Sequence, residues 1–142
     1  MSLIIGIDPG SRLTGYGIIE KDGSKLTFVD AGTIRTETKE MPERLKRIFA
    51  GVERIVKFYG PTEAAVEQVF MAQNPDSALK LGQARGAAVA ALVTCNHPNT
   101  LPGGSCSAAF LVRSQIINIA DGYAVEVPIP IKIRAIINMA KL

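Results

Sequence analysis

The sequence has no tryptophan, only two cysteines and a single histidine among its 142 residues. Cys95, Cys106 and His97 match no zinc-binding spacing and no disulfide framework, so a reducing compartment is the simpler interpretation. The N-terminus lacks the basic and then apolar run of a secretion signal. No apolar stretch reaches the roughly 18 residues that a membrane-spanning helix needs. We therefore expect a soluble cytoplasmic protein with no membrane partner.

Acidic residues are scarce after residue 93, where Asp121 and Glu126 are the only two. The whole chain carries a net charge of +3, which is compatible with nucleic-acid binding but is weak evidence for it. Its length and 47% hydrophobic content predict one domain, 1–142, with enough apolar residues for a core. The change in composition predicts an atypical C-terminal part, 94–142.

Three segments of the chain have the composition of strands. Residues 3–7 form a short apolar run, typical of a central strand. Residues 15–36 predict two strands around Asp22-Gly23 and a further turn at Ala31-Gly32. The run EAAVEQVF, residues 63–70, again favours a strand.

Two segments predict helices. In residues 42–61 apolar side chains recur every three or four positions, which gives one apolar face, and Gly60-Pro61 would end the helix. Residues 74–93 begin with Asn74 as N-cap and Pro75 at the first helical position. The many small residues of this second helix allow close approach of another helix, within the chain or between subunits. The resulting order, three strands, helix, strand, helix, indicates an α/β fold.

Two carboxylates interrupt these apolar strands. Asp8 ends the first strand, in IIGIDPG, and Glu67 lies within the run 63–70. If the two strands are neighbours in one sheet, both carboxylates could reach one Mg²⁺ ion, which prefers oxygen ligands. Such an ion can activate water and stabilise the leaving oxygen of a phosphodiester. The structural alternatives are a turn-forming role for Asp8 and a salt bridge from Glu67 to Arg or Lys.

The turn DPGSRLTGYG, residues 8–17, has a second functional interpretation. A strand-end aspartate followed by a small-residue hairpin also occurs as the phosphate-binding loop of actin-like ATPases and sugar kinases, where glycines let backbone amides approach phosphate. Those proteins need two such domains and an adenosine site. A chain of this length has room for neither, so an actin-like nucleotide-binding domain is the less favoured alternative.

Two long strings, GIDPGSRLTGYGII and AVEQVFMAQNPDSALKLGQARGAA, resemble the RuvC family of bacterial Holliday junction endonucleases, over about residues 3–93. The resemblance implies an α/β, RNase H-like fold: a mixed five-stranded sheet with helices on both faces. It also implies a homodimer that binds a four-way DNA junction and cuts it symmetrically with Mg²⁺ or Mn²⁺, in recombination and DNA repair. Branch-migration proteins are the partners that the resemblance implies.

Carried over position by position, the resemblance makes Asp8 and Glu67 metal-binding catalytic residues. Phe70 matches an aromatic residue that stacks on bases near the crossover, a contact worth about 1 to 3 kcal/mol per base. The basic residues Arg12, Lys80 and Arg85 lie in matching segments and could contact DNA phosphates. The structural alternatives are core packing for Phe70 and a solvated surface position for the basic residues.

The resemblance ends near Thr94. The family has two further catalytic aspartates on a C-terminal helix, in a string like DAADALA, whereas IINMAKL stands here without an acid. Three explanations are open: a replaced or frame-shifted C-terminus, a divergent one in which Asp121 or Glu126 supplies a third carboxylate, or an imperfect sequence. The first explanation predicts the alternative function, a protein that binds junction DNA but cleaves it poorly.

Overall fold

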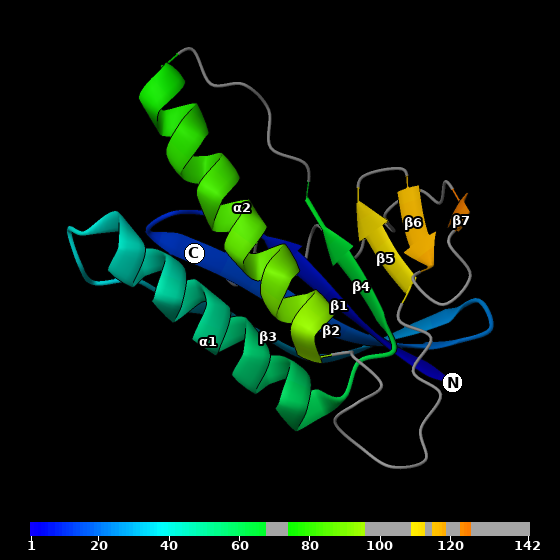
Figure 1. Ribbon diagram of the computed structural model, residues 1–142. Coiled ribbons are helices and arrows are strands. Elements are labelled where there is room, and N and C mark those ends of the chain that lie inside the picture. The colour runs from blue at the N-terminus through cyan, green and yellow to red at the C-terminus, as the bar shows by residue number, and fades with distance from the viewer. Residues whose placement is uncertain (68–73, 96–108, 113–114, 119–122, 126–142) are drawn as a thin grey trace.

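A computed structural model describes residues 1–67, 74–95, 109–112, 115–118 and 123–125 of this chain. These residues form one sheet of seven strands and two helices (Figure 1). The helices are α1 (Met41–Tyr59) and α2 (Pro75–Cys95). The strands are β1 (Ser2–Asp8), β2 (Leu13–Asp22), β3 (Lys25–Arg35), β4 (Glu63–Val66), β5 (Ala109–Val112), β6 (Gln115–Asn118) and β7 (Tyr123–Val125).

The strand order is β3-β2-β1-β4-β5-β6-β7, and the sheet is mixed. β1 pairs antiparallel with β2 and parallel with β4, and β4 pairs parallel with β5. The predicted order of three strands, helix, strand, helix is confirmed for the first 95 residues. The expected count of five strands is wrong, because β5, β6 and β7 come from a segment whose sequence matched no family pattern.

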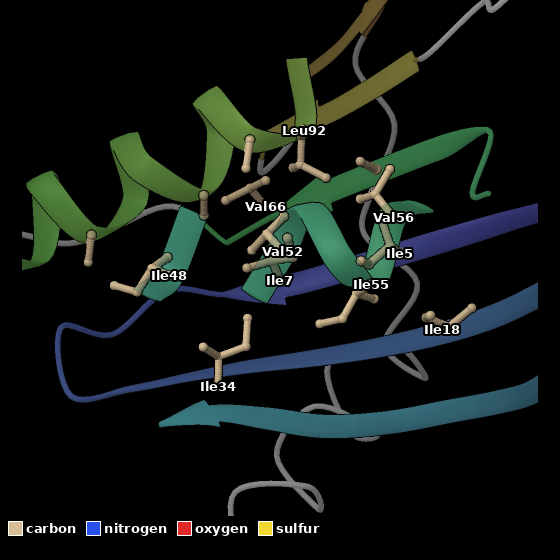
Figure 2. Close-up of a cluster of buried hydrophobic side chains, with 14 residues drawn as sticks. Ile5, Ile7, Ile18, Ile34, Ile48, Val52, Ile55, Val56, Val66 and Leu92 are labelled. Carbon is tan, nitrogen blue, oxygen red and sulfur yellow. The ribbon is translucent and has the colours of Figure 1, made fainter. Parts of the chain in front are cut away.

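Both described helices cover the same face of the sheet (Figure 1). Ile5 and Ile7 of β1 share one hydrophobic cluster with Val52 of α1 and Leu92 of α2 (Figure 2). Because side chains alternate along a strand, these two isoleucines mark one face of β1. The expectation of helices on both faces is therefore not met by the two helices that the structure describes.

Helix α1 begins at Met41, one residue before the predicted start, and ends at Tyr59. Gly60 follows in the left-handed conformation with a φ of 61°, and its N–H donates to the carbonyl of Val56 at 2.8 Å. This arrangement is a common helix ending that favours glycine. The predicted stop at Gly60 is confirmed.

Helix α2 begins as expected. The Asn74 side chain accepts a hydrogen bond of 3.0 Å from the backbone N–H of Asp76, and Pro75 is the first helical residue. The small side chains Ala84, Ala88 and Ala91 are fully buried, which brings α2 close to its neighbours. α1 and α2 pack against each other along this face.

The hairpin of β2 and β3 corrects one prediction. The two strands meet around Asp22-Gly23 as expected: Asp22 ends β2 opposite Lys25, and Gly23 and Ser24 form the turn, with a φ of 57° at Gly23. Ala31 and Gly32 form no turn; they continue β3 opposite Gly17 and Tyr16. A Cβ atom at Gly32 would lie 2.7 Å from the Tyr16 hydroxyl oxygen, so this glycine makes room for an aromatic ring rather than for a bend.

Candidate active site

Asp8 and Glu67 lie at equivalent positions on neighbouring parallel strands. The register pairs Ile7 of β1 with Val66 of β4, so the next residues along the two strands are Asp8 and Glu67. The backbone N–H of Glu67 donates to the Ile7 carbonyl at 2.8 Å, which continues the ladder past the end of β4. Neighbouring strands are about 4.8 Å apart, so the two carboxylates start close together. The condition for a shared ion, that the two strands are neighbours in one sheet, is therefore met.

The location of Glu67 differs slightly from the expectation. The strand predicted over 63–70 ends at Val66, and Glu67 is the first residue after it. Residues 68–73 lie outside the described part of the chain. Both carboxylates are therefore at the C-terminal ends of parallel strands, where an α/β sheet commonly places its functional groups.

The two carboxylates belong to the face of the sheet that α1 and α2 do not cover. Ile7 and Val66 are both members of the helix-side cluster. Alternation along the strands then directs Asp8 and Glu67 to the opposite face. Both residues are half-buried, so the pair remains partly accessible where these two central strands end.

The two carboxylates supply oxygen ligands of the kind that a hard divalent cation prefers, but only some of the ligands that such an ion needs. Mg²⁺ is commonly held by one or two carboxylates, with water and substrate oxygens completing its shell. Within the described ranges, no group of three or more His, Cys, Asp or Glu side chains is placed to hold a metal. Asp121 and Glu126, the candidates for a third carboxylate, lie outside the described residues.

The turn after Asp8 is closed by its own hydrogen bonds. The Gly10 N–H donates to the Thr14 hydroxyl oxygen at 3.2 Å, and the hydroxyl donates to the Gly10 carbonyl at 2.9 Å. Thr14 is fully buried, and a Cβ atom at Gly10 would lie 2.1 Å from the Leu13 carbonyl oxygen. The Gly10 amide thus already has a partner within the turn, which favours a structural role over phosphate binding by this amide.

Two of the predicted DNA-contacting residues come together. Arg12 of the β1–β2 turn and Lys80 of α2 line one pocket of about 430 Å³. Lys39 and Arg44 line the same pocket, and sequence reasoning missed both. No motif marks these two residues; the hydrogen bonds from Thr36 to the Ser11 and Arg12 carbonyls bring the β3–α1 connection to the β1–β2 turn.

The remaining predicted DNA contacts are not brought to this pocket. Arg85 lies on α2, half-buried, and its Nε finds no hydrogen-bond partner among the described residues. Phe70 lies outside the described residues.

Cys95 is half-buried at the end of α2, where burial raises the pKa of its thiol and disfavours the nucleophilic thiolate. Neither described helix is long and apolar enough to cross a membrane.

Comparison with known proteins places most of the described chain in one family. The family model "Crossover junction endodeoxyribonuclease RuvC" matches residues 4–100. A curated protein of that name from Acinetobacter baumannii (strain AYE) is 95% identical over 93 residues, 66% of this chain and 51% of that protein. The RuvC of Acinetobacter baylyi is 87% identical over 93 residues, with the same coverage. The chain thus spans about half the length of the curated relatives it matches.

Solved structures support the same grouping. Thermus thermophilus RuvC superposes with a TM-score of 0.59 and 25% sequence identity, over 79% of this chain and 64% of that one. A structure of T. thermophilus RuvC in complex with Holliday junction substrate gives a TM-score of 0.64 and 24% identity, over 80% and 65%. These likenesses confirm the α/β, RNase H-like fold predicted from the sequence.

Proposed function

This chain belongs to the RuvC family, and from that premise we propose that it is a divalent-metal-dependent endonuclease that cuts four-way DNA junctions. The observation that carries the proposal is the pairing of Asp8 with Glu67 on adjacent parallel strands. The activity would serve recombination and DNA repair in the bacterial cytoplasm.

Asp8 and Glu67 would hold the metal, Mg²⁺ or Mn²⁺, through their carboxylate oxygens. A bound divalent ion supplies Lewis acidity and a more acidic water for phosphodiester hydrolysis. The contribution of the chain is to fix the two carboxylates through the β1–β4 ladder and to direct both to one face.

Four further residues are proposed to contact the junction. Arg12 and Lys80, which share the pocket described above, would bind backbone phosphates. Arg85 of α2 would do so from the same helix as Lys80. Phe70 would stack on a base near the crossover, a contact that tolerates different sequences because every base has a π-face.

We also propose that the chain forms a homodimer through α2. Within the part of the chain that the structure describes, no neighbouring atom lies within 4 Å of where a Cβ would stand at Gly82 or Gly86. Leu79 and Val93 of the same helix are 62% and 39% exposed. A two-fold dimer matches the two equivalent strands of a four-way junction. Light scattering at micromolar concentration tests this proposal, and a monomer would contradict it.

Branch-migration proteins are the further partners we propose.

A second candidate function is junction binding with poor cleavage. It is favoured by the acid-free string IINMAKL, at the place where the family pattern has two more aspartates. Two carboxylates alone leave a two-metal site short of ligands. Under this alternative, the first 93 residues keep recognition while the altered C-terminal part has lost the chemistry.

One experiment separates the two functions. The chain is mixed with a labelled four-way junction and with a linear duplex of the same sequence, in Mg²⁺ and in EDTA. Preferred binding of the junction together with Mg²⁺-dependent symmetric nicks supports the endonuclease. Preferred binding without nicks supports the binding protein, and equal weak binding of both DNAs contradicts both functions.

A further inference from the structure

A basic pocket lies at the end of the sheet where β1 finishes, on the side that the helices cover. Four cationic side chains line it: Arg12, Lys39, Arg44 and Lys80. Its volume is about 430 Å³, and an adjoining hollow of about 410 Å³ shares Arg12, Lys39 and Arg44. These volumes fall in the range of small-molecule sites, which is ample for a phosphate group with its flanking sugars.

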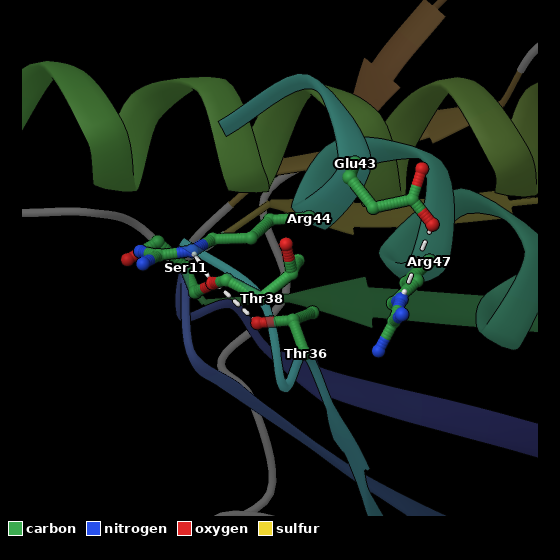
Figure 3. A network of polar contacts seen from close by, with 6 residues as sticks. All are labelled: Ser11, Thr36, Thr38, Glu43, Arg44 and Arg47. Atoms are coloured by element: carbon green, nitrogen blue, oxygen red, sulfur yellow. Dashed lines mark hydrogen bonds and ion pairs between the residues drawn. The ribbon is translucent and has the colours of Figure 1, made fainter. Parts of the chain in front are cut away.

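Hydrogen bonds hold two of the segments that line the pocket, the β1–β2 turn and the β3–α1 connection, in place (Figure 3). The buried hydroxyl of Thr36 donates to the Ser11 carbonyl at 2.7 Å, and its N–H donates to the Arg12 carbonyl at 3.1 Å. These bonds tie the β1–β2 turn to the end of β3. Nε of Arg44 donates to the Thr38 carbonyl at 2.8 Å, which ties α1 to the segment carrying Lys39. These bonds fix the backbone of the β1–β2 turn and the Arg44 side chain before any ligand binds, and the exposed side chains of Arg12 and Lys39 extend from these fixed segments.

The N-terminal ends of both helices reach the same pocket. Met41, the first residue of α1, and Ser77, in the first turn of α2, line it together. Figure 1 shows these two helix starts and the β1–β2 turn at one end of the molecule. The side chain of Glu40 makes no capping bond to α1. Helix N-termini carry partial positive charge, so they add to the attraction that the four cations exert on an anion.

Acidic groups balance only part of this charge. Asp76 pairs with Lys80 at 2.6 Å on the exposed face of α2, and Glu37 lines the adjoining hollow. Arg12 and Lys39 are exposed, so water screens both side chains until a ligand arrives. The balance of charge in and around the pocket favours an anion.

We propose that this pocket binds a backbone phosphate of the junction other than the one cleaved, with Arg44 and Lys39 among the cations that contact it. The inference rests on the proposed function and adds a subsite to it. The carboxylates of Asp8 and Glu67 are directed to the opposite face, so the pocket cannot hold the scissile phosphate. Arg12 is four residues from Asp8, at most about 14 Å along the chain. At about 3.4 Å per nucleotide, that distance corresponds to roughly four nucleotides of one strand.

The test measures binding of a labelled four-way junction to the full chain in EDTA, at several salt concentrations. We expect Lys39→Gln combined with Lys80→Gln to weaken binding about tenfold and to lower the slope of log affinity against log salt by about 1 to 2. Arg44→Ala should lower the slope by about 1, and Arg44→Lys should restore it in part. The matched control is Arg47→Ala, because Arg47 lies on the same helix and pairs with Glu43 on its exposed surface.

The outcomes separate this proposal from the proposed function. If the unmodified chain does not bind the junction, both fail. If it binds, and the lysine pair and Arg44→Ala keep the affinity and salt slope of Arg47→Ala, the pocket proposal alone is overturned. Lys39 is exposed and Lys80 half-exposed, so the lysine variant also keeps the test valid should Arg44→Ala disturb the fold. A fall in slope confined to the pocket variants supports the subsite, since a loss of folded protein would lower the active fraction without changing the slope.

Discussion

Glu67 lies beside Asp8 because its backbone N–H donates to the carbonyl oxygen of Ile7, one residue before the aspartate. This bond extends the parallel β1–β4 ladder beyond Val66 and places the two carboxylates at the same level along the strand direction. The geometry resides in the backbone, so it persists when either side chain is changed. Substitutions at the pair can therefore test chemistry with little effect on the fold.

Asp8→Asn and Glu67→Gln should each weaken Mn²⁺ binding strongly, because each removes one of two anionic ligands while preserving side-chain size. Isothermal titration of the full chain with Mn²⁺ measures this. The control is Asp22→Asn, which removes an exposed carboxylate from the β2–β3 turn. Equal affinities in the three variants and the unmodified chain would show that the pair is not the metal site.

The acids of the C-terminal part offer a separate prediction. If that part replaces the family sequence, Asp121→Asn combined with Glu126→Gln should leave Mn²⁺ affinity and junction nicking unchanged. The same titration and a nicking assay on labelled junction measure both quantities. A strong loss in this double variant would instead assign a third metal-binding carboxylate to Asp121 or Glu126.

Two glycines should respond in opposite directions to the same change. Gly32→Ala would bring a Cβ within 2.7 to 2.9 Å of the Tyr16 ring, and we expect it to lower the free energy of unfolding by about 1 to 3 kcal/mol. Gly82→Ala, in α2, meets no atom of the described residues within 4 Å and should raise the free energy of unfolding by up to about 1 kcal/mol, measured at a protein concentration below that at which the chain dimerises. Urea unfolding measures both changes.

A rescue experiment identifies the cause. Combining Tyr16→Ala with Gly32→Ala removes the ring that the new methyl group meets, so the cost of the alanine should largely disappear in that background. If Gly32→Ala destabilises equally with and without the ring, then a backbone effect rather than the close approach explains it.

The free energy of unfolding should fall at alkaline pH because the hydroxyl of Tyr59 loses its proton. The Tyr59 hydroxyl donates a hydrogen bond to the Asp30 carboxylate at 2.6 Å. This bond is the largest cause that raises the pKa of Tyr59 from 10.0 to about 12; burial and the negative charge of Asp30 are the next. A raised pKa means that the folded state favours the protonated tyrosine. The contribution of the Tyr59–Asp30 bond to the free energy of unfolding is therefore complete below pH 10 and is lost as the pH rises from 10 towards 12.

Urea midpoints measured at pH 8, 10 and 11.5 test this prediction in the unmodified chain and in Tyr59→Phe. The phenylalanine variant should be less stable at pH 8, and the gap between the two proteins should narrow as the pH rises. A constant gap over this range would contradict the role given to the Tyr59–Asp30 bond.

The carboxylate pair could be predicted from the sequence because each acid interrupts an apolar run that reads as a buried strand. The pairing of those strands was only a condition of the sequence argument, and the parallel β1–β4 register supplies it. The basic pocket could not be predicted in full, since Lys39 and Arg44 belong to no motif and meet Arg12 only through the fold. Ala31-Gly32 was misread as a turn because a glycine that accommodates Tyr16 has the same local sequence as one that bends the chain.

Nicking of a labelled four-way junction under single-turnover conditions, with Mg²⁺, tests the central claim most directly. The unmodified chain is compared with Asp8→Asn and with the control Asp22→Asn, and binding is measured in the same samples. The account predicts symmetric nicks by the unmodified chain and by Asp22→Asn, and binding without nicks by Asp8→Asn. Equal nicking by Asp8→Asn, or no preference for the junction over duplex DNA, would contradict it.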